Sequence, residues 1–358
     1  MSTAFHNLLV DEVRKETADS VSLRLAVPED LRDRFRFQPG QHLTLRAMID
    51  GEDVRRNYSI CTAPHDGELR VAIKQIAGGL FSGWANSALS AGQMLDVLPP
   101  HGSFTWRFDP ARKGLYAGFA GGSGITPILS LLKTALQVEP ASTFILFYGN
   151  RTTRSVMFLE EIAALKDRFM GRLIVHHFLE DEEGDFDILN GRLDQAKVAD
   201  VLASLVAPQA LDAAFICGPG PMMDAVEAGL AAGGMARERI LVERFSAGEL
   251  SEAQRAAVRT LEQQAQGRRM RVTIDGRRRT IAYDAANGSI LENARAEGLP
   301  APYACKAGVC ATCRAKVISG KVEMVQNYGL TAAEVEQGYV LTCQAVPASD
   351  DVELDYDA

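Results

Sequence analysis

Four cysteines in the last part of the chain have the spacing Cys-x4-Cys-x2-Cys-x29-Cys: Cys305, Cys310, Cys313 and Cys343. This spacing is typical of a plant-type [2Fe–2S] site, in which four thiolates hold two irons that share two sulfides. Each iron takes two thiolates, so one short loop supplies three ligands and a distant strand supplies the fourth. The residues between the ligands are small, Gly308 among them, which lets the backbone curl and direct its N–H groups at sulfur. The spacing therefore predicts a [2Fe–2S] cluster.

Two other uses of these cysteines fit the sequence less well. A zinc ribbon usually needs two Cys-x2-Cys pairs, and the chain contains one. A disulfide framework is typical of short secreted chains, whereas this chain has 358 residues and lacks a basic-then-apolar leader at its start. Cys61 and Cys217 are isolated in the sequence and need no disulfide.

The composition is that of a globular protein with two or three domains, since 358 residues exceed the size of one ordinary core. Hydrophobic residues make up 47% and charged residues 23% of the chain, and no apolar run approaches a membrane span. We therefore expect a cytoplasmic protein without a membrane partner. The net charge of −8 argues against a nucleic-acid partner.

Residues 1–110 are predicted to form an antiparallel β-barrel. Short alternating stretches recur at 21–25, 42–46, 69–73 and 95–98, separated by turn sequences such as Asp50-Gly51 and Asp66-Gly67.

One stretch of this domain has the side chains of a flavin site. On a strand, Arg56, Tyr58 and Ile60 point one way, while Ser59 points the other. A guanidinium can bind a phosphate, an aromatic ring can stack on a planar cofactor, and a hydroxyl can bind its edge. An exposed arginine and tyrosine on an ordinary strand is the alternative.

A second stretch, Gly78-Gly79-Leu80-Phe81-Ser82, follows the strand that ends at Lys74. It is similar to a glycine-assisted phosphate turn that opens a helix, a weak signal by itself.

Residues 111–245 show strand–helix alternation. Apolar runs at 115–120, 143–148, 173–178, 213–217 and 240–242 alternate with helical stretches, which predicts a doubly wound parallel sheet. The first turn, 121–127, has three glycines that let a pyrophosphate approach a helix start, with Thr126 as N-cap and Pro127 at the first helical position. Its spacing is not the ordinary dinucleotide fingerprint, and a tight turn is the alternative.

Two further loops follow strands of this sheet. Cys217-Gly218-Pro219 ends the fourth strand, and if the first and fourth strands are neighbours both loops face one crevice. Cys217 then lies beside the reacting groups, or is a small buried hydrophobic residue. After the second strand, Arg151, Arg154 and Ser155 occur where an acidic residue would bind the ribose of NAD, which favours NADPH. Solvated arginines are the alternative.

Taken in order, Arg56-Asn57-Tyr58-Ser59, the loop 121–127 and Cys217-Gly218-Pro219 resemble the ferredoxin–NADP reductase superfamily over residues 1–245, and the remainder resembles plant-type ferredoxins. The resemblance implies FAD, held by Arg56, Tyr58, Ser59, Ile60, Ile73, Lys74, Gly79, Phe81 and Ser82. It implies that the pyridine nucleotide is held by Gly122, Gly124, Thr126, Arg151, Arg154, Ser155, Cys217, Gly218 and Pro219. It also implies that Glu243 and Phe245 lie near the flavin ring.

Residues 246–268 are predicted to form a linker, partly helical because Ser251 and Gln254 fit a capping box. Residues 269–358 are predicted to begin with a hairpin of 270–274 and 279–283. A helix follows, with a capping box at Ser289 and Glu292 and a stop at Gly298. The resemblance implies a β-grasp ferredoxin fold here, and the whole chain is of the multidomain α+β class. Basic clusters and an acidic tail in this region are docking sites or, more commonly, solvated faces.

The combination of three sites has a chemical reason. NADPH gives two electrons as hydride and a [2Fe–2S] cluster accepts one at a time, while a flavin can do both. We expect hydride transfer at Ser59, Cys217 and Glu243, followed by single-electron transfer to the cluster and to a di-iron oxygenase component. The chain most resembles the reductase subunits of bacterial phenylacetyl-CoA epoxidases. Reductases of ring-hydroxylating dioxygenases or other monooxygenases, and a redox-sensing binding protein, are the alternatives.

Overall fold

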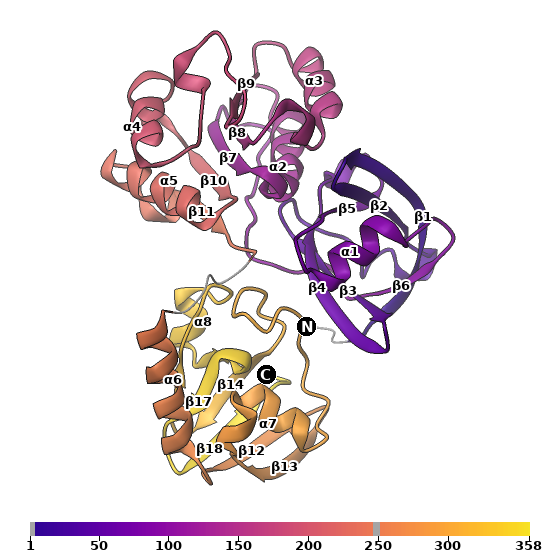
Figure 1. Ribbon diagram of the computed structural model, residues 1–358, viewed down its shortest axis with the longest axis vertical. Coiled ribbons are helices and arrows are strands. Elements are labelled where there is room, and N and C mark those ends of the chain that lie inside the picture. The colour runs from indigo at the N-terminus through magenta and orange to yellow at the C-terminus, as the bar shows by residue number, and fades with distance from the viewer. Residues whose placement is uncertain (1–3, 246–250) are drawn as a thin grey trace. The chain divides into compact units, whose positions relative to one another are not determined.

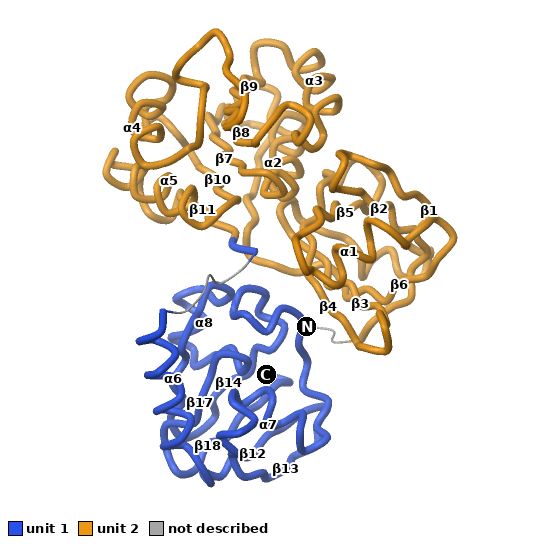
Figure 2. Tube along the Cα trace, viewed as in Figure 1, with its two compact units in different colours: residues 1, 244–358 blue, residues 2–243 orange. Residues whose placement is uncertain are grey.

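The structure, a computed structural model, describes residues 4–245 and 251–358. The chain divides into two compact units: one ends at Glu243, and the other comprises Arg244–Ala358 (Figure 2). Each unit is described by itself below.

The first part of the larger unit is an antiparallel barrel. Its strands are β1 (His6–Thr17), β2 (Ser20–Ala26), β3 (His42–Ile49), β4 (Glu52–Ser59), β5 (Leu69–Lys74) and β6 (Met94–Val97), in the spatial order β4-β3-β6-β1-β2-β5. A bridge between Ile60, just after β4, and Val71 of β5 joins the two ends of this order. The predicted barrel is therefore confirmed, and β1 is an additional strand. Its alternation is obscured by charged residues and by a bulge between Val10 and Glu12.

Local turn chemistry shapes the barrel. Asp50 and Gly51 both have positive φ, 51° and 83°, as the two-residue hairpin between β3 and β4 requires. Helix α1 (Leu80–Ser87) begins after Gly79, preceded by Gly78 at φ 70°. The predicted glycine turn does open a helix.

A five-stranded parallel sheet forms the second part of this unit. Its strands are β7 (Leu115–Gly121), β8 (Thr143–Asn150), β9 (Leu173–Leu179), β10 (Ala213–Cys217) and β11 (Ile240–Glu243), in the order β11-β10-β7-β8-β9. Helices α2 (Ile125–Val138) and α3 (Leu159–Arg168) cover one face, and α4 (Gln195–Ser204) and α5 (Gly220–Ala232) cover the other (Figure 1). The doubly wound sheet is confirmed, and β7 and β10, the first and fourth strands, are neighbours.

Helix α2 packs on the barrel as well as on the sheet. The Ser130 hydroxyl donates to the carbonyl of Thr62 at 2.6 Å. The Lys133 ammonium contacts the carboxylates of Asp66, in the barrel, and Glu161, on α3. Opposite charges on both sides raise the pKa of Lys133 against the effect of burial. The helix thus fixes the barrel against the sheet.

The prediction that Thr126 caps α2 is wrong. A 3-10 turn at Gly122–Gly124 leads directly into the helix, so Gly124 is the N-cap and Thr126 is already helical. Its hydroxyl donates to the carbonyl of Ser123 at 3.0 Å instead of accepting from a helix N–H.

The smaller unit contains a mixed five-stranded sheet in the order β13-β12-β18-β14-β16 and a two-stranded sheet. The elements are α6 (Glu252–Ala265), β12 (Arg269–Ile274), β13 (Arg277–Ala282), α7 (Ile290–Ala296), β14 (Arg314–Ser319), β15 (Val322–Met324), α8 (Ala332–Glu336), β16 (Tyr339–Leu341), β17 (Ala345–Pro347) and β18 (Asp351–Asp355). The predicted hairpin is β12–β13, turned by Asp275 and Gly276 at positive φ.

Helix caps in this unit match the sequence in two of three places. Ser251 and Gln254 form the expected capping box of α6, and Gly298, at φ 76°, ends α7. Ser289 caps α7, but the Glu292 side chain does not return to it. It forms an ion pair with Lys306 of the cysteine loop at 2.8 Å, so the second capping box is only half formed.

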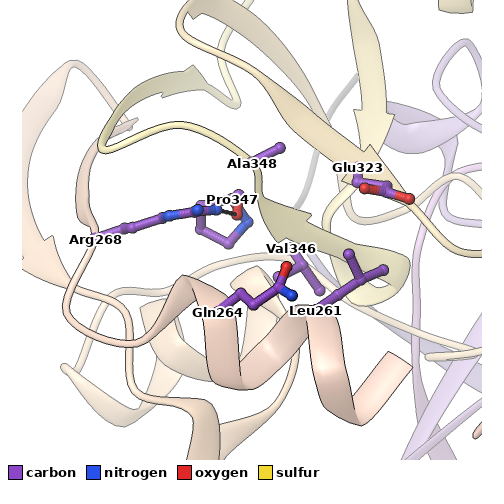
Figure 3. Close-up of a pocket in the computed structure, with 7 residues that line it drawn as sticks. All are labelled: Leu261, Gln264, Arg268, Glu323, Val346, Pro347 and Ala348. Carbon is purple, nitrogen blue, oxygen red and sulfur yellow. Dashed lines mark hydrogen bonds between the residues drawn. The ribbon is translucent and has the colours of Figure 1, made fainter. Parts of the chain in front are cut away.

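Helix α6, expected within the linker, packs its C-terminal end on the smaller unit through buried Ala265. Residues 246–250 of that linker lie outside the described residues. A small hollow of about 110 Å³ lies beside the helix (Figure 3), lined by Leu261, Gln264, Arg268, Glu323, Val346, Pro347 and Ala348. The Arg268 guanidinium crosses it to donate to the carbonyl of Pro347 at 2.6 Å.

The basic cluster and the acidic tail neutralise each other across paired strands. Arg269 faces Asp351 and Arg271 faces Glu353 in the β12–β18 register, with ion pairs of 2.8 and 3.2 Å. Arg278 of β13 also reaches Glu353, at 2.8 Å. These charges form a cross-strand ladder. Among the described helices, none combines the length and apolar composition that a membrane span requires.

Buried Glu139 connects Asp109, in the segment that follows the barrel, to Tyr116 of the parallel sheet. Replacing Glu139 tests how much this connection stabilises the unit. Its carboxylate accepts from the Asp109 N–H at 2.8 Å, the Tyr116 hydroxyl at 2.8 Å and the Ser142 hydroxyl at 2.6 Å. Glu139→Ala leaves two buried hydroxyls, those of Tyr116 and Ser142, and the Asp109 N–H without their acceptor, and we expect it to cost about 3 kcal/mol. Amide hydrogen exchange in β7 and β10 measures this loss. Exposed Asp167→Ala is the control, and equal protection in the two variants would contradict the role of Glu139.

Candidate flavin, nucleotide and cluster sites

The flavin candidates lie on two neighbouring pieces of the barrel. Tyr58 of β4 packs against Phe81 of α1 with ring centroids 5.5 Å apart. Ser59 is buried, and it is the β-partner of His42 on β3. Arg56 is exposed and donates to the carbonyl of Arg55 at 2.7 Å. The structure therefore brings the β4 residues and α1 together, with the arginine at the surface.

The turn before α1 is stabilised by Ser82, which lies in the first turn of that helix. Ser82 accepts from the Ile76 N–H and donates to the Gly79 carbonyl, both at 3.2 Å. Of the other flavin candidates, Ile73 is buried in the barrel and Lys74 forms an ion pair with Asp19 at 3.2 Å.

The two glycine loops of the parallel sheet pack directly on one another. A Cβ on Gly124 would overlap the carbonyl of Cys217, and one on Gly121 would lie 2.5 Å from a ring carbon of Pro219. Only glycine allows the first loop to approach the second this closely. Both loops therefore lie against one another at the carboxyl ends of β7 and β10, and the crevice that they were expected to face stays a prediction.

The barrel and the parallel sheet meet at a histidine that the sequence reasoning missed. His42 Nδ1 lies 3.8 Å from a carboxylate oxygen of Glu243, and Glu243 is the β-partner of Cys217. His42 also forms a ring contact with His101, with the two Nε2 atoms 3.0 Å apart. The structure thus brings Ser59, Glu243 and Cys217, the predicted catalytic residues, to one region.

Burial from solvent favours the neutral forms of two titratable side chains in this region, His42 and Cys217. His42 is buried, and burial, followed by the neighbouring His101, holds its pKa well below the usual value. Cys217 is fully buried, and burial, followed by Glu243, raises the pKa of its thiol well above the usual value. Cys217 is therefore a neutral thiol at pH 7. In the sequence, His42 was visible only as the first residue of an expected strand.

The loop after β8 contacts two acidic residues, Asp181 and Glu182, that the sequence analysis did not anticipate. Arg151 is 77% exposed and forms an ion pair with Asp181 at 3.2 Å, and Thr153 donates its N–H to Glu182 at 3.1 Å. Both acids follow β9, so the sequence reasoning, which followed β8, missed them. Ser155 closes a 3-10 turn by bonding to Thr152. Arg154 is exposed and has no side-chain partner within the described ranges.

The four cysteines of the smaller unit form two pairs. The Cys305 and Cys310 thiols are within hydrogen-bonding reach of one another, as are those of Cys313 and Cys343. All four are free. The hydrogen bond from Cys305 holds the pKa of Cys310 well below its usual value, and the one from Cys313 lowers the pKa of Cys343. Within the described part of the chain, no group of three or more His, Cys, Asp or Glu side chains could hold a metal ion.

The backbone of the cysteine loop is curled as the small residues predicted. Lys306, Gly308 and Ala311 have positive φ values of 54°, 73° and 53°. The Ala307 N–H donates to the Cys305 sulfur at 3.3 Å, and Thr312 lies 3.2 Å from the Cys310 sulfur. Two thiol pairs, with an N–H directed at one sulfur and a hydroxyl within hydrogen-bond reach of another, fit a two-iron cluster in which each pair serves one iron.

One predicted position differs in the structure. Cys343 lies on a 3-10 turn, Thr342–Gln344, and not on a strand, because β16 ends at Leu341. The Thr342 hydroxyl donates to the carbonyl of Cys313 at 2.8 Å, which fastens this turn to the cysteine loop. Phe245 is 46% exposed and belongs to the smaller unit, and its place near the flavin ring stays a prediction.

Comparison with known proteins agrees with this arrangement. Three family models match in order: the oxidoreductase FAD-binding domain over residues 7–106, the oxidoreductase NAD-binding domain over 119–228, and the 2Fe-2S iron-sulfur cluster binding domain over 272–348. A subunit of the 1,2-phenylacetyl-CoA epoxidase from Escherichia coli (strain K12) is 46% identical over 99% of both chains. The ferredoxin reductase component of 3-ketosteroid-9-alpha-monooxygenase from Rhodococcus rhodochrous is 36% identical over 98% of this chain and 96% of that protein.

A solved structure has the same modular order. Phthalate dioxygenase reductase, described as a modular structure for electron transfer from pyridine nucleotides to [2Fe–2S], aligns with a TM-score of 0.59 at 23% identity and 98% coverage of both chains. The resemblance seen in the sequence is confirmed. The chain belongs to the ferredoxin–NADP reductase superfamily, in the family of oxidoreductases that are reductase components of oxygenase systems and join FAD-binding, NAD-binding and [2Fe–2S] domains in one polypeptide.

Proposed function

We propose that this protein passes electrons from NADPH through FAD and a [2Fe–2S] cluster to a di-iron oxygenase, and that this oxygenase is a phenylacetyl-CoA 1,2-epoxidase. The observation that carries the proposal is the 46% identity to the subunit of the Escherichia coli epoxidase over 99% of both chains. When bound, FAD takes two electrons as hydride and returns them one at a time, which connects the nicotinamide to the cluster.

The larger unit supplies the binding and orientation for the hydride step. Tyr58 and Ser59 are proposed to contact the flavin, and Gly122 and Gly124 to let the nucleotide pyrophosphate approach the start of α2. Gly124 leaves no room for a side chain against Cys217, so the proposed nucleotide loop packs directly on the residue with the buried thiol. Cys217, neutral and buried, is proposed to pack against the nicotinamide and to exclude water, not to act as a nucleophile.

The smaller unit supplies the exit for single electrons. Cys305 and Cys310 are proposed to hold one iron, and Cys313 and Cys343 the other, in accordance with the two thiol pairs. The Ala307 N–H and the Thr312 hydroxyl, both near sulfur, would stabilise negative charge there.

The oxygenase partner can be tested by reconstitution. In the presence of O₂, the purified protein, NADPH, phenylacetyl-CoA and the purified oxygenase subunits of a phenylacetyl-CoA epoxidase should give epoxide with NADPH consumed in a coupled ratio. The 36% identical monooxygenase reductase favours another oxygenase as the second candidate. Rapid reduction of artificial one-electron acceptors without epoxide formation would support that candidate and contradict the first.

Substitution of one cluster ligand separates the two redox steps. Cys310→Ser should abolish reduction of one-electron protein acceptors, because the cluster is lost, while flavin reduction by NADPH stays within about twofold, since hydride transfer uses the other unit. Anaerobic stopped-flow absorbance of the flavin and a cytochrome c reduction assay measure the two steps. Loss of both in a variant that retains its FAD would contradict the modular mechanism.

The nucleotide preference is tested at the loop after β8. Arg154→Ala should weaken NADPH binding about tenfold, roughly 1.4 kcal/mol, and leave NADH binding nearly unchanged, since only NADPH carries the 2′-phosphate. Arg151→Ala is the matched control, because Arg151 is already paired with Asp181 and should contribute less. Equal losses for both nucleotides in Arg154→Ala would refute this assignment.

A further inference from the structure

The proposed reaction leaves a proton that has no assigned acceptor. NADPH and two one-electron acceptors give NADP⁺, two reduced acceptors and one H⁺, because a hydride is two electrons and a proton. If both electrons leave through a cluster, the proton must leave the flavin site separately. This consideration rests on the proposed function.

The pair of His42, which is buried, and His101, which is partly buried, lies beside Ser59, one of the residues proposed to contact the flavin. His42 is the first residue of β3 and the direct partner of Ser59 on β4, so their side chains lie on the same face of the sheet. His42 and His101 also exchange both backbone hydrogen bonds, at 2.9 and 3.1 Å, which fixes the two rings against each other. A Cβ on Gly102 would lie 2.9 Å from His42 Nδ1, so this glycine leaves the space that the ring occupies.

The hydrogen bonds determine which nitrogen of each ring carries a proton. His101 Nδ1 lies 3.3 Å from the Pro99 carbonyl, which can only accept, so His101 Nδ1 carries the proton. The neutral ring then has a bare Nε2, and His42 Nε2–H donates to it across 3.0 Å. His42 Nδ1 is consequently a lone pair, and it faces the Glu243 carboxyl at 3.8 Å.

We propose that His42, supported by His101, accepts at Nδ1 the proton left at the flavin site after each hydride, and that Glu243 passes this proton to solvent. A new N–H bond forms at His42 Nδ1, and the positive charge is shared with His101 through the Nε2–H···Nε2 hydrogen bond. The N–H bond then breaks as the Glu243 carboxylate takes the proton and releases it to water. The Glu243 side chain is 17% exposed against 6% for His42, so the carboxylate is the wetter of the two groups.

The groups around His42 favour release of the accepted proton over its retention on the ring. The ionisable groups that face His42 are His101 and Glu243, and Glu243 in turn neighbours Cys217 on the next strand. Burial and His101 keep the pKa of His42 low, so at neutral pH a proton accepted there is given up again. A neutral imidazole with a free lone pair is the state in which a general base is ready to act.

The first test is the tautomer of His42 in the FAD-bound protein. Long-range ¹H–¹⁵N spectra of the ¹⁵N-histidine-labelled chain distinguish Nδ1–H from Nε2–H, and six histidines are few enough to assign by single substitution. We expect a neutral His42 with its proton on Nε2, and His101 with its proton on Nδ1, at pH 7. A proton on His42 Nδ1 at that pH would overturn the proposal, because no acceptor site would remain.

The second test separates proton transfer from hydride transfer. In His42→Gln, flavin reduction by NADPH should stay within about twofold of wild type, while reoxidation of the flavin by ferricyanide should slow about tenfold or more. The slowed step should show an increased solvent deuterium isotope effect and should be partly restored by added imidazole. His65→Gln is the control, since His65 in the same domain faces Asp66 and not this site.

The outcomes separate the two proposals. Equal slowing of both steps in His42→Gln with full FAD content, or unchanged reoxidation, would overturn the role of His42. Absence of flavin reduction by NADPH in the wild-type protein would contradict the proposed function, and the tautomer measurement would still decide the state of His42. If His42→Gln does not retain FAD, His101→Gln is measured in its place, and a normal reoxidation rate there would refute the supporting role of His101.

Discussion

The burial of helix α2 on both of its sides is the constraint on which the larger unit depends. The helix packs its apolar face on the parallel sheet and binds the barrel through Ser130 and Lys133. Its first turn follows the glycine loop at 122–124, so the same rigid element carries the candidate phosphate loop and sets the barrel against the sheet. Because the two functions share one helix, a change in barrel orientation would also move the nucleotide loop relative to Ser59.

Regular elements of this chain could be predicted because local patterns determine them. The apolar runs of the parallel sheet and the hairpin at Asp275-Gly276 needed only periodicity and turn chemistry. Strand β1 escaped prediction because a bulge interrupts its alternation. The capping role of Thr126 failed for a related reason. A 3-10 turn before the helix shifted its start by two residues, and no local sequence rule separates that geometry from an ordinary cap.

The candidate site residues likewise fall into two groups, those predicted by a local sequence pattern and those brought together by tertiary packing. The four cysteines proposed as cluster ligands lie on one short loop and one turn, and their spacing alone predicted this role. His42 and Glu243 are distant in sequence, and they meet because the barrel and the sheet pack together. The acids Asp181 and Glu182 likewise reach the loop after β8 from the end of another strand. Contacts of this kind depend on tertiary packing, and a single sequence carries no local signal for them.

The proton and the electrons of one hydride have different requirements, and the chain meets them with different chemistry. Electrons need redox centres that lie close together. The paired thiols, with N–H groups directed at sulfur, are suited to hold such a centre, an iron–sulfur cluster. A proton needs a lone pair within hydrogen-bond reach and a path to water. The buried His42, with its donor direction fixed by His101 and the Pro99 carbonyl, offers such a lone pair beside a partly exposed carboxylate. In the proposed mechanism the proton and the electrons leave through separate groups, so a change at the histidine pair is expected to alter proton release without affecting the cluster.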